Sequence, residues 1–397
     1  MKRRSILRLT SALVGAGIGA LGIGALGIGA PGIGAHAQDV ALPGQVAWTA
    51  YDTGSAGYNQ AVAIGAALKN KAGTNLRVLP GKNDVARTEP LRQGKVQFSA
   101  TGVGGSFMAQ EGAFEFGEKR WGPQPIRVLL ANNGGAINLA VGVAGDLGVE
   151  SYADLKGKRV AYVKGAPALN VNTEAYLACG GLTWDDVERV EFGGFGDSWR
   201  GLASGQVDAA FASTNSGLAY EAASSPRGLV WPEIKPDDKA CLDAMTAIAP
   251  FFSANAASVG AGIDGGEPAN GATYAYPVLV AMAEQDADLV YNMTKAMVEL
   301  YPDFSGKAPG IDGWALDKQN FQWVVPYHDG AIRYFEEVGQ WSEEAQKHND
   351  RLIEKQRVLR EAWNALEAAE VADGEWDAKW AEARRSALEA AGFPVVF

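Results

Sequence analysis

Strand-like and helix-like segments alternate along most of this chain, and this alternation constrains the fold more than any other feature. Helices are expected over residues 58–71, 84–93 and 170–178. Strands are expected over six short apolar runs: 45–49, 76–79, 96–100, 126–131, 137–143 and 159–163. Strands that alternate with helices of about ten residues predict an α/β fold with mainly parallel sheets.

Three loops at strand ends open directly into helices, and each is rich in small residues. They span residues 53–58, 101–106 and 164–170. Ligands of open α/β sheets bind at the carboxyl ends of the strands. The unpaired N–H groups of a helix N-terminus suit a carboxylate. Any one of these loops is compatible with an ordinary tight turn, but three in succession favour a ligand site.

The first 37 residues have the layout of a bacterial secretory signal peptide. Four basic residues within 1–8 precede a Gly/Ala-rich apolar stretch, which ends in the A-x-A cleavage signal at 35–37. We expect export to the periplasm and cleavage. The uncharged run 9–38 is long enough to span a bilayer, so an uncleaved anchor is the alternative.

Charge and composition exclude several functions. The net charge of −11 argues against a nucleic-acid partner, although a cleft inside an acidic protein can be locally positive. The two cysteines and three histidines show no metal-binding spacing, so neither a metal nor a cofactor is expected. Cys179 and Cys241 are either two buried thiols or, in an oxidising periplasm, a disulfide.

Two motifs that suggest enzymes or nucleotide binding are incomplete. The G-x-G-x-x-G at residues 17–22 lacks a preceding strand. The D-T-G-S at 52–55 matches aspartic proteases, but the chain has no second copy to supply the partner carboxylate. No set of nucleophile, base and oxyanion donors is recognisable, so we expect a binding protein and not an enzyme.

The composition changes after residue 339. Apolar residues at helical spacing predict an amphipathic helix over 341–371, and Trp376 and Trp380 mark a second, shorter helix. We expect residues 340–397 to form a helical extension that packs onto the globule without a part in its chemistry.

Five segments occur in the order found in one receptor family. Residues 52–59 are similar to a G-T-G-S-G-T-Y-Y loop, and 151–160 contain D-L-K-G-K-R-V. Further matches are a G-x-[IV]-D-A-x-F strand at 205–211, a late helix at 288–296 and H-D-G-A-I-R-Y-F at 328–335. Together they resemble the TAXI-type extracytoplasmic receptors of TRAP transporters, over roughly residues 45–339.

The resemblance implies a two-lobed type II periplasmic-binding fold. One lobe would hold residues 39–135 and 270–339, and the other 136–269. Such a receptor is monomeric, closes on a small carboxylate such as glutamate or 2-oxoglutarate, and delivers it to integral-membrane TRAP permease subunits. Alternatives are a receptor for an ABC-type importer or a sensory binding protein, each with a different small ligand, and a periplasmic enzyme on the same fold.

The resemblance and the loops together name the candidate ligand-binding residues. From one lobe they are Gly54, Ser55, Ala56, Gly57, Tyr58, Arg87, Thr101, Gly102 and Val103; from the other, Gly165, Ala166, Ala168, Asn170, Thr214 and Asn215. Arg87 is either a bidentate carboxylate clamp or a solvated helix residue. Trp199 is either a lid or a core residue. Pro167 removes one N–H donor from the third loop, so the ligand can differ from the family's.

Overall fold

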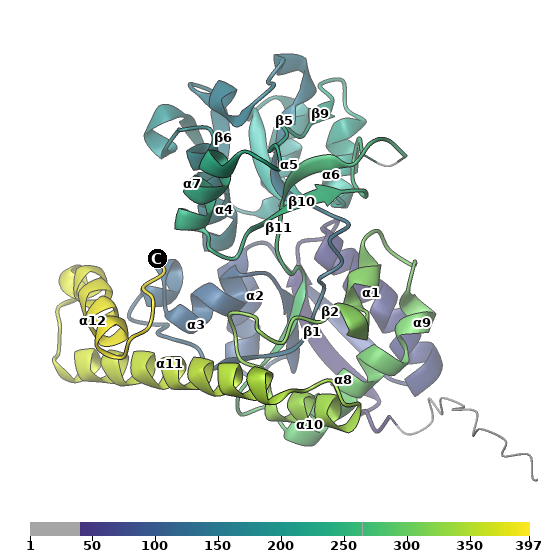
Figure 1. Cartoon of the computed structure of the whole chain (residues 1–397), viewed down its shortest axis with the longest axis vertical. Coiled ribbons are helices and arrows are strands. Elements are labelled where there is room, and N and C mark those ends of the chain that lie inside the picture. The colour runs from purple at the N-terminus through teal and green to yellow at the C-terminus, as the bar shows by residue number, and fades with distance from the viewer. Residues whose placement is uncertain (1–39, 264) are drawn as a thin grey trace, which may run out of the picture. The chain divides into compact units, whose positions relative to one another are not determined.

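The structure is a computed structural model that describes residues 40–263 and 265–397 (Figure 1). The predicted signal peptide lies outside the described residues. The described chain forms two five-stranded sheets, each covered by helices, and a separate two-stranded sheet. In those residues no helix is long and apolar enough to cross a membrane.

The first sheet has the strand order β2-β1-β3-β12-β4. Its strands are β1 (Gln45–Tyr51), β2 (Asn75–Gly81), β3 (Phe98–Thr101), β4 (Ile126–Ala131) and β12 (Val278–Met282). The helices that belong to this part of the chain are α1 (Ala56–Ala67), α2 (Asp84–Arg92), α3 (Ala109–Glu111), α8 (Ala287–Glu299), α9 (Tyr301–Phe304) and α10 (Asp329–Glu337). A π-helical turn extends α1 over Leu68–Ala72, and another spans Gly104–Met108 after β3.

The second sheet has the order β7-β6-β8-β5-β9. Its strands are β5 (Leu139–Ala144), β6 (Arg159–Val163), β7 (Glu188–Phe192), β8 (Ala209–Ser213) and β9 (Leu229–Val230). The helices around it are α4 (Pro167–Cys179), α5 (Phe195–Ser204), α6 (Gly217–Ala223) and α7 (Lys239–Ile248). The two-stranded sheet pairs β10 (Ser253–Ala257) with β11 (Ala269–Thr273).

The prediction of mainly parallel sheets is wrong, because both five-stranded sheets are mixed. In the first, β1 runs parallel to β2 and β3, but β12 is antiparallel to β3 and β4. In the second, β6 is parallel to β7 and β8, whereas β5 is antiparallel to β8 and β9. The apolar run of β12 identifies a buried strand, but its direction depends on how the chain returns to the first sheet after building the second.

Two segments connect the sheets and hydrogen-bond to each other. One follows β4 and the other precedes β12. The Asn132 amide donates to the Pro277 carbonyl and the Tyr276 amide donates to the Asn132 carbonyl, each over 2.9 Å. Paired crossing segments of this kind are where a hinge between two lobes would lie. The predicted lobe boundaries at 135/136 and 269/270 stay a prediction.

A disulfide joins Cys179 at the end of α4 to Cys241 in α7, with an S–S distance of 1.99 Å. Of the two alternatives that the sequence left open, the structure therefore has the disulfide. The two cysteines are 62 positions apart along the chain.

The C-terminal extension consists of α11 (Glu343–Ala368) and α12 (Trp376–Ala390). The two helices share a small core of their own, in which Trp363 packs edge to face on Trp376 and Trp380. Both indole N–H groups of α12 reach the main body: Trp376 donates to the Gly117 carbonyl and Trp380 to the Gly112 carbonyl. The extension thus packs onto the globule by buried hydrogen bonds.

Candidate functional site

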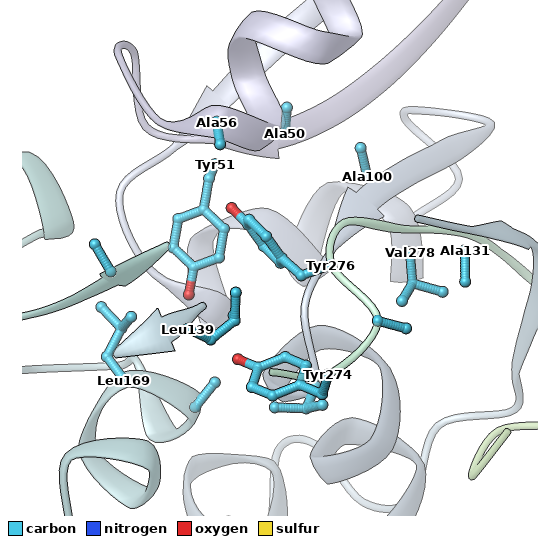
Figure 2. Close-up of a cluster of buried hydrophobic side chains, with 14 of the residues drawn as sticks. Ala50, Tyr51, Ala56, Ala100, Ala131, Leu139, Leu169, Tyr274, Tyr276 and Val278 are labelled. Carbon is cyan, nitrogen blue, oxygen red and sulfur yellow. The ribbon is translucent and has the colours of Figure 1, made fainter. Parts of the chain in front are cut away.

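Loops from both sheets meet around one narrow cavity. Its volume is about 20 Å³, the room that a single water molecule needs. It is lined by Tyr51, Ser55, Gly102, Tyr274 and Tyr276 on the side of the first sheet, and by Leu139, Ala168, Leu169, Phe195, Phe211, Ala212 and Ser213 on the side of the second. Figure 2 shows Tyr51, Tyr274 and Tyr276 gathered with Leu139 and Leu169 in this cluster. Any ligand larger than water requires the two sides to separate.

The N-terminus of α1 forms one wall of the cavity. Ser55 caps the helix, because its hydroxyl accepts a hydrogen bond from the Tyr58 amide over 3.2 Å. The Tyr276 hydroxyl lies at the same helix end, where a Cβ atom on Gly57 would approach it to 3.1 Å. Burial raises the pKa of Tyr276 to about 12, although hydrogen bonds from Gly57 and Ser55 oppose this rise. The phenol is therefore neutral at physiological pH.

The N-terminus of α4 faces the cavity from the other side, and an aspartate of the first-sheet half occupies it. The Ala168 amide donates to Asp84 Oδ2 over 3.0 Å. Next to it, the Val85 amide donates to the Gly165 carbonyl over 3.1 Å. Gly165 has φ +70°, a left-handed conformation that favours glycine. This turn lets the third loop approach the start of α2 closely.

The Asp84 carboxylate is also the counter-ion of Arg87, one turn further along α2. The Nη2–Oδ1 distance is 2.5 Å, and both side chains are fully buried. Tyr51 donates its hydroxyl to the same Oδ1 over 2.9 Å, and its ring lies 3.5 Å from the guanidinium carbon. Arg87 Nε donates to the Thr101 hydroxyl over 3.0 Å. Arg87 is thus neither solvated nor exposed to the cavity; Tyr51 lies against it.

Burial next to a carboxylate keeps the Tyr51 phenol protonated. Desolvation raises its pKa well above the ordinary value, the negative charge of Asp84 raises it further, and Arg87 opposes both. Burial likewise raises the pKa of Tyr274, whose hydroxyl accepts a hydrogen bond from Asn172 Nδ2 over 2.8 Å. The polar side-chain atoms of the cavity wall are therefore hydroxyl groups, and those of the three tyrosines are neutral.

A second aspartate bridges the two halves beside the first. Asp52, directly after β1, accepts a hydrogen bond from the Gly196 amide through Oδ2 over 3.1 Å. Gly196 is the second residue of α5, so this carboxylate lies at the N-terminus of that helix. The N-termini of α4 and α5, two helices around the second sheet, therefore each contact a carboxylate from the part of the chain that forms the first sheet.

Apart from Arg87, the predicted site residues fall into four groups, and the first three lie in or beside the loops around the cavity. Ser55, Gly102 and Ala168 line the cavity, and Ala56 and Gly57 form the helix start beneath it. Gly54 and Gly165 shape the two flanking turns with φ of +88° and +70°. Tyr58, Thr101, Val103 and Ala166 adjoin these segments but do not line the cavity.

Three further predicted residues use their side chains elsewhere. The Asn170 amide makes two hydrogen bonds to the backbone of Val163, so it closes its own loop. The Thr214 hydroxyl donates to the Val259 carbonyl. Asn215 Nδ2 donates to the Pro309 carbonyl. Trp199 is a core residue, since it is buried and its indole N–H donates to the Phe211 carbonyl over 3.0 Å.

Sequence reasoning missed the aromatic residues of the cavity. Tyr51 is the last residue of β1 and Phe195 the first residue of α5. Both could have been predicted by extending the search for loops between strands and helices to the residues that flank them. Tyr274 and Tyr276 belong to the returning crossing segment, and Phe211 to a buried strand, where no local pattern separates a cavity wall from the core.

The strand orders, the paired crossing segments and the late return of β12 define a two-lobed type II periplasmic-binding fold. The model of the NMT1-like family matches residues 49–339. The chain belongs to the NMT1-like family.

Several solved structures are distantly similar. An alkanesulfonate-binding protein from Xanthomonas axonopodis pv. citri, bound to MOPS, is 15% identical with a TM-score of 0.42, over 82% of this chain and 94% of that one. A protein of Bordetella bronchiseptica RB50 is 16% identical with a TM-score of 0.44, over 79% and 98%. An ancestral arginine-binding protein bound to glutamine is 17% identical with a TM-score of 0.40, over 68% and 99%.

Proposed function

We propose that this protein is an extracytoplasmic solute-binding receptor. It would hold a small molecule between its two lobes and present it to a membrane transporter. The observation that carries the proposal is the cavity whose wall comes from both sheets, at the loops that follow their strands. Membership of the NMT1-like family supports it.

Ligand exchange in such a receptor requires the lobes to open. The paired crossing segments at Asn132 and Tyr276 provide a hinge, and the contacts of Asp84 and Asp52 with the α4 and α5 N-termini would close the cleft over the ligand. These contacts are few and polar, so water can replace them when the lobes separate.

The transporter partner is proposed from the five motifs that resemble TAXI-type receptors. On that basis the receptor would be exported to the periplasm, act as a monomer and serve the integral-membrane subunits of a TRAP permease. A receptor for an ABC-type importer fits the family match comparably. Uptake of the ligand by membrane vesicles distinguishes them: a TRAP system requires an ion gradient, whereas an ABC importer requires ATP.

The receptor function is tested by thermal unfolding of the exported protein against a panel of small carboxylates, amides, amino acids, aromatic compounds and sugars. A ligand that binds only the folded state adds about 3 kcal/mol at a hundredfold excess over its Kd, so the melting temperature should rise clearly for one chemical class. Ala168→Leu fills the cavity wall and should abolish this rise. Ala153→Leu, at an exposed position, is the matched control.

Two results would contradict the proposal. One is the absence of any stabilising ligand in the panel. The other is a stabilising ligand whose effect survives Ala168→Leu unchanged, since that ligand would bind elsewhere. The predicted carboxylate ligand remains a prediction, and the position of Asp84 counts against it.

A further inference from the structure

The ligand class of the cleft depends on what already occupies its anion-binding features. Four such features were expected: the helix starts after the loops 53–58, 101–106 and 164–170, and the guanidinium of Arg87. Two of them, the α4 N-terminus after loop 164–170 and Arg87, are engaged by the same side chain. Asp84 Oδ2 accepts the Ala168 amide at 3.0 Å, and Oδ1 lies 2.5 Å from Arg87 Nη2. The Asp84 carboxylate therefore makes the contacts that we expected of a ligand carboxylate, one with a helix N-terminus and one with Arg87.

The surroundings are shaped to keep Asp84 in this position. Its side chain is fully buried, and the Tyr51 hydroxyl gives Oδ1 a second hydrogen bond at 2.9 Å. A Cβ atom on Gly104 would lie only 2.2 Å from Oδ2, so the glycine leaves the space that the carboxylate fills. A ligand carboxylate could take the place of Asp84 between Arg87 Nη2 and the α4 N-terminus only by displacing this paired, buried charge.

The rest of the cavity offers no charge to an anion or a cation. All of its lining residues are aromatic, aliphatic, serine or glycine. The α1 N-terminus, the third place for an anion, is covered by the Tyr276 hydroxyl. The neighbouring α5 N-terminus holds the carboxylate of Asp52. Aromatic and aliphatic walls with a few hydroxyl groups suit a neutral ligand that is largely apolar.

We propose that Asp84 is a specificity-determining residue, a built-in carboxylate that fills the anion position between Arg87 and α4, so that the cleft selects uncharged, largely apolar small molecules and rejects carboxylates. This inference rests on the proposed receptor function and narrows its ligand class. Under this proposal the ligands are neutral compounds, such as amides or alcohols with an aliphatic or aromatic group, and not glutamate-like carboxylates.

Matched pairs of compounds test the selectivity. Wild-type protein is titrated, by calorimetry and by thermal unfolding, with isobutyramide against isobutyrate and with benzamide against benzoate. We expect the amide of each pair to bind at least tenfold more tightly. In Asp84→Ala the preference should reverse, because the anion position is then vacant and Arg87 is unpaired. Tighter binding of the carboxylates by wild-type protein would overturn the proposal.

Chemical rescue tests the anion position without any knowledge of the ligand. Asp84→Ala leaves a space the size of formate, and Asp84→Gly a space the size of acetate. Each variant should lose several degrees in melting temperature and regain most of the loss with its matching anion, but not with chloride. If a variant does not fold alone, the yield of refolding from urea with and without the anion is the readout.

Two controls complete the rescue. Asp84→Ala/Arg87→Gln should show no rescue, because the cation that holds the anion is gone. Asp243→Ala, which removes an exposed carboxylate on α7, should show no response to formate. Equal stabilisation of all variants by formate, or none in Asp84→Ala, would overturn the assignment of Asp84.

The two proposals fail in different ways. Rescue by formate together with no stabilising compound in the pairs or in the whole panel would leave Asp84 as the occupant of the anion position and contradict the receptor function. Wild-type binding of carboxylates that depends on Arg87 would keep the receptor function and contradict the selectivity.

Discussion

Arg87 is a buried charge whose partners are groups of the protein itself. Its charge is fully buried and is balanced by Asp84, by the Thr101 hydroxyl and by the Tyr51 ring. One guanidinium nitrogen, Nη1, has no hydrogen-bond partner among the residues that the structure describes. A buried ion pair is stable only with good geometry and additional hydrogen bonds, because the free energy lost when both ions leave water is about as large as the free energy gained from their attraction.

Removal of one partner of this pair should therefore be costly. We expect Arg87→Met to lower the free energy of unfolding by about 3–5 kcal/mol, since Asp84 then stays buried without its cation. Urea denaturation followed by tryptophan fluorescence measures the change. Arg357→Met removes two exposed ion pairs, one with Glu354 and one with Glu361, and it should have little effect. A similar loss in both variants would contradict the role given to burial.

At the scale of elements, α4 is the helix on which the site depends from the second-sheet side. Its N-terminus contacts Asp84, and its C-terminal residue Cys179 is bonded to Cys241 of α7. Tyr176, a buried residue of α4, packs its aromatic ring edge to face on Tyr152 and Phe252. One end of the helix is thus held by a covalent bond and the other forms the cavity wall.

Loss of the disulfide should destabilise the protein without loss of its fold. We expect the double variant Cys179→Ala/Cys241→Ala to unfold with about 2–4 kcal/mol less free energy, because a loop of 62 residues is no longer closed in the unfolded chain. Thermal unfolding with and without dithiothreitol measures the effect. The reductant should lower wild-type protein to the level of the variant and leave the variant unchanged; an insensitive wild-type protein would contradict the prediction.

At the scale of the whole molecule, a buried charge cluster fastens the C-terminal extension to the body. Glu111 in α3 is fully buried and forms ion pairs with Lys355 of α11 and Arg384 of α12. Arg384 Nη2 lies 2.6 Å from Glu111 Oε2, and its Nε donates to the Glu111 carbonyl over 3.0 Å. One carboxylate thus holds both helices of the extension.

Neutralising this carboxylate should loosen the extension. We expect Glu111→Gln to cost about 3–5 kcal/mol, because two buried cations lose their counter-ion. Hydrogen exchange of α12 amides should accelerate at the same time, while the strands of the two sheets change less. Glu118→Gln, whose partner Arg120 is mostly exposed, is the matched control. Unchanged protection of α12 would show that the tryptophans alone hold it.

Local pattern was sufficient to predict many elements of the first half of this protein and the two C-terminal helices. The predicted strands 126–131 and 159–163 match β4 and β6, and the predicted helix 84–93 matches α2 within one residue. The period of the apolar residues indicates which face of an element is buried, and runs of small residues indicate turns. Both features depend on residues that are neighbours in the sequence. Ser55, Gly102 and Ala168 of these loops line the cavity, because loops that follow strands gather at one edge of a sheet. Their role in ligand binding stays a prediction.

Only the tertiary structure decided the direction of β12, the disulfide between α4 and α7, and the chemistry of the cleft. Each depends on contacts between residues far apart in the chain. Asp84 and Ala168 are separated by 84 positions, and Tyr276 reaches the α1 N-terminus from the returning segment. The sequence by itself therefore determined which small-residue loops follow the strands, because turns and burial depend on neighbouring residues. Only the folded chain placed the Asp84 carboxylate between Arg87 and the Ala168 amide, because these groups come from distant parts of the chain.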